Sequence, residues 1–388
     1  MILVTGASGF IGARLVQRLA RNCRRPVTAL VHRLGTVGTA RVAALSGVRL
    51  VAGDIRDSSI VDEAMHGCTA VVHCALDISS PLSVREAVTA LGTRTVLEAA
   101  RKNDVRHIIF LSTAAVHSWR APGRWNEDAP VQGSDSYSRS KLAAEALLLR
   151  NTDVPVTVIR PTCVYGPFSR SWTVTPVTFL RLGVPLVSVD DGGRANLIYV
   201  DNLVEMILAA LDRPADTHRI YLANEEEPAS WDRLYSAYAR TIGLPLLRYP
   251  VADSRWRVWR EELSVSLSNG KALAGRVVSE MRAPLLRGLA AGHRHVPLLQ
   301  RGDRFIPAGM LRRVAEAARG AGGGPVSAAP AAGQNGFRSF APRELREFYN
   351  AKATFSAERA RLELGWLPRI GAAEAIERTC DWIKFAGL

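Results

Sequence analysis

The sequence is short of cysteine and of long apolar runs, and each shortage excludes a class of protein. Its five cysteines, at positions 23, 68, 74, 163 and 380, are odd in number and lack CxxC spacing. A disulfide framework and a thiolate metal site are therefore not expected. No apolar stretch approaches the roughly 20 residues of a membrane helix, and no signal-peptide pattern precedes the first strand-like run. We expect a cytoplasmic protein with reduced thiols and no bound metal.

Acidic residues are fewer than basic ones, and the excess of basic residues is unevenly distributed along the chain. The chain carries 50 Lys+Arg against 36 Asp+Glu, a net charge of +14. Residues 271–320 alone hold ten basic and three acidic side chains. Such a segment can attract an anionic substrate or a peripheral membrane surface. No zinc-finger spacing and no aromatic-interleaved strand accompanies it, so nucleic acid is not an expected partner.

Lysine is the scarcest charged residue, with five among the 50 basic positions. One of the five closes the stretch YSRSK, residues 137–141, in a segment with helical spacing of its apolar residues from Ser136 onwards. Tyr137 and Lys141 stand four apart and share one face of that helix. A compact ammonium can approach a neighbouring hydroxyl more closely than a guanidinium can. The pair is a candidate catalytic unit if the surrounding motifs agree.

The first half of the chain alternates short apolar strands with amphipathic helices. This pattern predicts an α/β fold, a Rossmann-type doubly wound parallel sheet with a smaller, interleaved C-terminal substrate lobe. We assign 1–166 plus 196–220 to the nucleotide-binding domain. The substrate lobe would comprise 167–195 plus 221–388, with a basic insert at about 250–345.

A glycine-rich turn, TGASGFIG at 5–12, joins the first strand to the first helix. Gly6 permits a tight turn, Gly9 lets a pyrophosphate approach the backbone, and Gly12 allows the helix to pack on the strand. The helix N-terminus then presents free N–H groups to the phosphate. A dinucleotide site is predicted here, and its candidate residues are Gly6, Ser8, Gly9, Phe10, Ile11 and Gly12.

The end of the second predicted strand carries no carboxylate. It reads ALVHR, and no Asp or Glu occurs between Val27 and Val51. A carboxylate at this place would bind the ribose of NAD, whereas an arginine accommodates a 2′-phosphate. His32 and Arg33 therefore predict NADP in preference to NAD.

With these motifs in order, the chain resembles the extended short-chain dehydrogenase/reductase family, in its epimerase/dehydratase-like branch, over about 1–245 and 350–388. The resemblance rests on the glycine turn, GDIRD, HCAL, LSTAAVHS, YSRSK, RPTCVYGP, NLIYVDN and LGWLP. It implies a catalytic Thr113, Tyr137 and Lys141. It also implies cofactor contacts from Asp54, Ile55, Cys74, Ala75, Tyr137, Lys141, Pro161 and Val164. Arg194 is a candidate for holding a substrate phosphate.

Five residues, in three places along the chain, depart from the family pattern. Thr89 stands where an Asn is usual, and His117-Ser118 replaces Tyr-Gly. Ala114-Ala115 follows Thr113 in place of the Asp-Glu pair of sugar-nucleotide 4,6-dehydratases, so that reaction lacks its acid and base here.

The Tyr-Lys-Thr set predicts proton transfer coupled to nicotinamide hydride transfer. Lowering a tyrosine pKa from about 10 to near neutrality requires roughly 4 kcal/mol, which a nearby ammonium helps to supply. We expect an NAD(P)-dependent oxidoreductase acting on a secondary alcohol or carbonyl of a small, anionic substrate. The alternatives are a nucleotide-sugar epimerase with tightly held NAD and a non-catalytic NADP-binding sensor or scaffold. A homodimer is the expected assembly.

Overall fold

The computed structural model describes residues 1–21, 25–76, 82–117, 119, 122–188, 193–213, 216–225, 229–249 and 347–388. The basic insert predicted at about 250–345, including 271–320, lies outside the described residues, and its expected membrane or substrate contacts stay predictions. In the described part of the chain, no helix is both long enough and apolar enough to cross a membrane.

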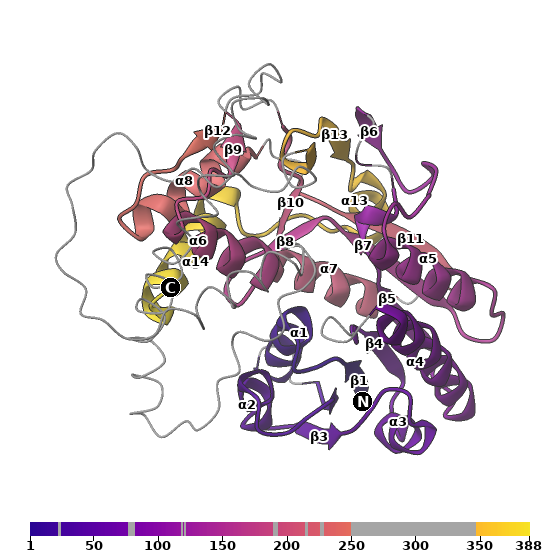
Figure 1. The fold of residues 1–388 in the computed structure, drawn as a ribbon. Coiled ribbons are helices and arrows are strands. Elements are labelled where there is room, and N and C mark those ends of the chain that lie inside the picture. The colour runs from indigo at the N-terminus through magenta and orange to yellow at the C-terminus, as the bar shows by residue number, and fades with distance from the viewer. Residues whose placement is uncertain are drawn as a thin grey trace.

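A seven-stranded, entirely parallel sheet forms the centre of the molecule, in the order β11-β7-β5-β4-β1-β2-β3 (Figure 1). Its strands are β1 (Ile2–Thr5), β2 (Val27–Val31), β3 (Val48–Ala52), β4 (Ala70–His73), β5 (His107–Leu111), β7 (Val156–Pro161) and β11 (Arg219–Ala223). Every residue of β1, β2, β5 and β7 is buried, because helices cover both faces. The strand order reverses between β1 and β4, which opens a crevice at their carboxyl ends. The predicted fold class is confirmed.

Two layers of helices enclose this sheet. One layer contains α1 (Phe10–Arg21), α2 (Val37–Ala43) and α7 (Val200–Asp212), and its apolar side chains share a core with the β1 and β2 residues Val4 and Ala29. The other contains α3 (Ser58–Met65), α4 (Leu82–Lys102) and α5 (Ser136–Leu149), packed on Leu3 and Ile108. The alternation of side chains along each strand therefore divides the interior into two cores.

Most of the remaining elements gather beyond the carboxyl ends of the sheet strands, while α13 (Glu358–Leu364) lies along the edge strand β11, where Glu363 pairs with Arg219 (Figure 1). They are the 3₁₀ turn η1 (Ala114–Val116), β6 (Gly123–Trp125), β8 (Cys163–Tyr165), the π-helical turn η2 (Arg170–Val174), α6 (Thr175–Arg181), β9 (Val187–Ser188), β10 (Leu197–Tyr199), α8 (Trp231–Thr241), β12 (Arg248–Tyr249), β13 (Ala353–Phe355), α13 (Glu358–Leu364) and α14 (Ala372–Ala386). Three parallel strand pairs join them, β10 with β8, β12 with β9 and β13 with β6. The exact domain boundaries stay a prediction.

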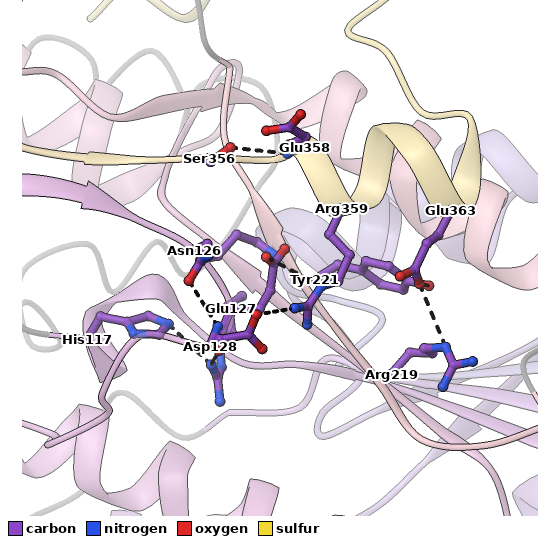
Figure 2. Close-up of polar contacts among 12 residues, drawn as sticks. His117, Asn126, Glu127, Asp128, Arg219, Tyr221, Ser356, Glu358, Arg359 and Glu363 are labelled. Atoms are coloured by element: carbon purple, nitrogen blue, oxygen red, sulfur yellow. Dashed lines mark hydrogen bonds and ion pairs between the residues drawn. The ribbon is translucent and has the colours of Figure 1, made fainter.

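The pairing of β6 with β13 matters for the site because it ties the chain between Thr113 and Tyr137 to the C-terminal segment. Ser356 continues the contact by donating its N–H to the Trp125 carbonyl oxygen at 2.9 Å. Figure 2 shows Glu127 and Asp128, just after β6, facing Arg359 of α13. The segment between Thr113 and Tyr137 is thus held by side chains more than 200 positions away.

Candidate active site

The glycine-rich turn is packed so closely that side chains are excluded from it. Gly6 has φ of +64°, and a Cβ there would lie 2.8 Å from the Ala75 backbone. A Cβ on Gly12 would lie 2.4 Å from the Gly6 carbonyl oxygen. The first turn of α1 contains no acidic residue, so its partial positive charge is not neutralised by its own side chains. The turn fits the diphosphate of a dinucleotide, and Ser8 to Ile11 would hold it.

A buried chain of hydroxyl and imidazole groups supports the loop that carries Ala75. The Ala75 N–H donates to Thr5 Oγ1 at 3.2 Å, and that hydroxyl lies 2.7 Å from His73 Nδ1. His73 Nε2 is 3.2 Å from Thr93 Oγ1, whose proton goes to the Thr89 carbonyl oxygen at 2.6 Å. His73 therefore donates through Nε2 and accepts through Nδ1, and burial lowers its pKa to about 3. It is a neutral structural residue.

The residues predicted to meet the adenosine half of the cofactor lie at the ends of β2 and β3. His32 and Arg33 are exposed, and the Arg33 carbonyl oxygen accepts from Thr39 Oγ1 at 2.7 Å. Arg56 binds both oxygens of the Asp54 carboxylate, at 3.0 and 2.6 Å, and these hydrogen bonds lower the Asp54 pKa. Oδ1 also accepts from the Arg56 main-chain N–H at 2.9 Å, so Oδ2 is the oxygen that keeps a second lone pair for an amino group.

Ile55 packs against α4 at Gly92, where a Cβ would lie 2.7 Å from the isoleucine side chain. Helix α2 also approaches the glycine turn closely, because a Cβ on Gly38 would lie 2.0 Å from the Ser8 carbonyl oxygen. Small residues on two helices thus let the predicted cofactor contacts approach one another.

Lys141 is the best-anchored member of the predicted catalytic set. Its side chain is 2% exposed, its Nζ donates to the Leu111 carbonyl oxygen at 2.7 Å, and the ammonium lies 4.7 Å from the centre of the Phe110 ring. Burial raises the pKa of the Cys74 thiol to about 12, and the nearby Lys141 ammonium opposes that rise. The ammonium therefore connects α5, the end of β5 and the loop after β4.

Thr113 and Tyr137 belong to η1 and α5, two elements that contact each other. Thr113 follows β5 after Ser112 and is the N-cap of η1, where its hydroxyl accepts from the Ala115 N–H at 3.2 Å. Tyr137 is half-buried in the first turn of α5, one helical turn before Lys141. A reciprocal capping box between Asp135 and Ser138 begins α5 here, which fixes where the tyrosine enters the site.

A buried ion pair beside these residues was not predicted from the sequence. Glu145, one turn after Lys141 on α5, accepts from Arg160 at 3.1 and 2.6 Å, and the two side chains are 3% and 4% exposed. Ser112 also donates its hydroxyl proton to Glu145. The helical spacing of Tyr137, Lys141 and Glu145 was a usable signal for Glu145, whereas nothing local pointed to Arg160 on β7.

The other predicted site residues are spread over the crevice. Pro161 ends β7 opposite Ala223, and Val164 lies in β8 opposite Ile198. Arg194 is exposed, and its main-chain N–H donates to the Ala351 carbonyl oxygen at 2.8 Å. Its proposed phosphate contact stays a prediction.

Thr89, the substitute for the usual Asn, donates its hydroxyl proton to the Arg85 carbonyl oxygen of its own helix at 2.9 Å. Its proton is therefore engaged away from Tyr137 and Lys141. Within the described ranges, no cluster of three or more His, Cys, Asp and Glu side chains could hold a metal ion.

A glycine turn at a parallel-sheet switch point, together with a Tyr-Lys helix beside it, defines a nucleotide-binding α/β enzyme. The family model for the NAD dependent epimerase/dehydratase family matches residues 2–223, more than half of the chain. The protein belongs to this family, as the resemblance in its sequence indicated.

Similar proteins come from several activities within the family. The chain is 27% identical to a UDP-glucose 4-epimerase of Vibrio cholerae over 266 residues, which covers 64% of this chain and 78% of that protein. It is 33% identical to a dTDP-glucose 4,6-dehydratase of Streptomyces antibioticus over 207 residues, covering 49% of this chain and 62% of the dehydratase.

Among solved structures, a UDP-glucuronic acid 4-epimerase from Bacillus cereus in complex with NAD superposes with a TM-score of 0.66. Its identity is 17%, with 99% of this chain and 98% of that chain covered, so the likeness shows a shared fold. These relatives support the epimerase alternative better than the general oxidoreductase we placed first. The expected preference for NADP gains no support from them, since this solved relative holds NAD.

Proposed function

We propose that the protein is a nucleotide-sugar epimerase that keeps NAD bound and inverts one secondary alcohol of the sugar. The observation that carries the proposal is the composition of η1. Ala114 and Ala115 follow Thr113 where a 4,6-dehydratase needs an acid and a base, whereas the Tyr137–Lys141 pair is complete. Chemistry by this set is limited to reversible oxidation at one carbon.

Bound nicotinamide would supply the hydride acceptor and donor. Tyr137 takes the proton from the sugar hydroxyl and later returns it to the same oxygen. Lys141, held by the Leu111 carbonyl oxygen, stabilises the phenolate by its charge. Thr113 orients the reacting oxygen by a hydrogen bond, because the residue lies just beyond the carboxyl end of β5 and is 9% exposed.

A nucleotide sugar would extend from this point toward the elements beyond the sheet. Arg194 is the cationic candidate for its diphosphate, since the guanidinium is exposed while its backbone is fixed against Ala351. A guanidinium can hold a phosphate by two parallel hydrogen bonds. The named substrates of the relatives, UDP-glucose above all, are the first compounds to test.

The deciding experiment follows the fate of a label. Purified protein is denatured to measure retained nicotinamide, then fresh protein is incubated with UDP-glucose deuterated at C4. We expect the C4 epimer with its deuterium retained and no net change in free NADH. Release of label into a free cofactor pool would instead establish a reductase. Formation of a 4-keto-6-deoxy sugar would establish a dehydratase and overturn the argument from Ala114 and Ala115.

A reductase using NADPH is the second candidate, supported by Arg33. This side chain is exposed at the end of β2, where a 2′-phosphate would lie, and forms no ion pair with the described residues. An enzyme that exchanges its cofactor each cycle should show turnover that depends on added NADPH. No dependence on added cofactor is expected for the epimerase.

A further inference from the structure

His117 occupies the far end of the buried polar chain that begins beside Thr113. Ser112 is bound to Glu145, Glu145 to Arg160, and Arg160 Nη1 lies 3.2 Å from His117 Nε2. The imidazole is 1% exposed. Each member of the chain is thus shielded from water, and its hydrogen bonds must be supplied by the protein.

The contacts of His117 determine its protonation state. A guanidinium N–H can only donate, so Nε2 must accept and carries no proton. On the other side of the ring, Nδ1 lies 3.3 Å from the Pro130 carbonyl oxygen, which can only accept. Nδ1 must therefore carry the proton. The Arg160 contact requires a neutral ring, and the Pro130 contact matches the tautomer with its proton on Nδ1.

The groups around His117 disfavour a positive charge on it. Burial and the Arg160 guanidinium on β7 lower the His117 pKa, and Glu145 on α5 acts in the opposite direction. Glu145 is already bound to Arg160 and Ser112. From β6 and β13 the aromatic rings of Trp125 and Phe355 face the imidazole, with centroids 6.4 and 6.1 Å away.

Two further acidic residues of the same loop, Glu127 and Asp128, both pair with Arg359. Glu127, in the loop that also carries Pro130, accepts from the Leu222 N–H at 2.8 Å and pairs with Arg359 at 3.8 Å. Figure 2 shows its carboxylate facing Arg359 of α13 and His117 to one side. It is therefore not available to balance a protonated His117.

We propose that His117 is a positioning residue whose neutral form holds Arg160, and through Glu145 and Ser112 sets Thr113, so that protonation of His117 disables the site. The inference rests on the proposed role of Thr113. An imidazolium would offer Arg160 a donor and a positive charge in place of an acceptor. Arg160 would turn away, and Glu145 and Ser112 would lose the partner that fixes them.

Two substitutions at His117 test separately its role as a hydrogen-bond acceptor for Arg160 and its ability to gain a proton. His117→Gln keeps an amide oxygen for Arg160 and an amide N–H for Pro130, and it does not titrate. His117→Phe keeps the ring volume without either hydrogen bond. We expect the Gln variant to retain most of the wild-type kcat and the Phe variant to lose about tenfold more. Retained NAD should be the same in all three proteins.

The pH profile is the readout that a merely structural role would not move. In wild-type protein, kcat should fall with acid in the pH range below the ordinary histidine pKa of about 6.5, because burial and Arg160 lower the His117 pKa, while the Gln variant loses this acid limb. Because the folded-state pKa is lowered, wild-type stability should also fall relative to the Gln variant as pH drops through that window. Equal acid limbs in the two proteins would overturn the proposal.

A spectroscopic arm distinguishes this inference from the epimerase proposal. Protein labelled with ¹⁵N in its eight histidines gives the His117 signals by comparison with the Gln variant. We expect a neutral ring protonated on Nδ1 near neutral pH. A ring protonated on Nε2 contradicts the inference whatever the activity. If the ring is protonated on Nδ1 as expected but the protein epimerises no nucleotide sugar, only the proposed function is contradicted.

Discussion

The cofactor turn after β1 and the catalytic end of β5 lie at the same edge of the sheet, with β4 between them, but are built in opposite ways. The turn is local. Gly6, Gly9 and Gly12 lie within seven residues, and their contacts are made by backbone atoms. The catalytic end of β5 depends on side chains that reach it from α5 and β7, 30 to 43 positions away. Substitutions in the glycine turn should abolish cofactor binding. Substitutions at the end of β5 should lower the catalytic rate while the cofactor stays bound.

The largest effect expected on chemistry alone is that of Tyr137→Phe. Removing the phenolic proton donor should lower kcat by roughly 10²–10⁴-fold, the usual contribution of a general acid or base. NAD retention and thermal stability should be unchanged, because the aromatic ring remains. Steady-state kinetics with the identified substrate provide the measurement.

Tyr221→Phe serves as the matched control for that prediction. Its hydroxyl donates to Glu363 of α13 at 2.8 Å, outside the catalytic set. Little change in kcat is expected. Near-normal turnover by Tyr137→Phe would mean that another group moves the proton.

Gly12→Ala should reduce cofactor binding, which Tyr137→Phe leaves unchanged. The new Cβ would lie 2.4 Å from the Gly6 carbonyl oxygen, so the backbone of the turn must shift. We expect loss of retained NAD, and loss of activity as a consequence. Gly371→Ala is the control, since a Cβ at Gly371 meets no atom within 4 Å. Full NAD content in Gly12→Ala, measured by absorbance after denaturation, would contradict the proposed diphosphate site.

The same contrast explains what the sequence could predict. The turn, the alternating strands and the Tyr-Lys helix are local patterns, and the structure confirms the sheet and the helix that begins at Ser136. Arg160 could not be assigned to Glu145, because their pairing depends on the register of β7 against β5. The β6–β13 pair is equally non-local, since it joins residues more than 200 positions apart. Local sequence motifs cannot identify contacts between residues so far apart in the chain.

The buried ion pair offers a smaller but measurable effect on stability. Glu145→Gln leaves Arg160 charged and buried, and removal of one partner of such a pair typically costs about 3–5 kcal/mol in free energy of unfolding. Glu374→Gln on α14 is the control, because its exposed pair with Arg378 should contribute only about 0.3–0.5 kcal/mol. Denaturant unfolding of both variants tests the difference.

A double variant, Glu145→Leu with Arg160→Met, sharpens that test. Replacing both charges by apolar groups should recover much of the stability. It should not recover kcat if the pair positions Ser112 and Thr113. Recovery of both would show that the pair only stabilises the fold.

The smallest effect concerns Arg33, at the outer edge of the cofactor half. The side chain is exposed, so a 2′-phosphate would gain only about 1 kcal/mol from it, or about fivefold in affinity. Arg33→Ala should therefore weaken NADP binding by about that factor and leave NAD binding unchanged. Because the contact is hydrated, the difference should shrink as salt screens it.

Arg25→Ala, which removes an exposed arginine paired with Asp212, controls for the loss of one positive charge. Titrations of cofactor-free protein with both nucleotides give the affinities. Equal loss for NAD and NADP would mean that Arg33 supports the end of β2 and reads no phosphate, and the reductase candidate would then lose the observation that favours it.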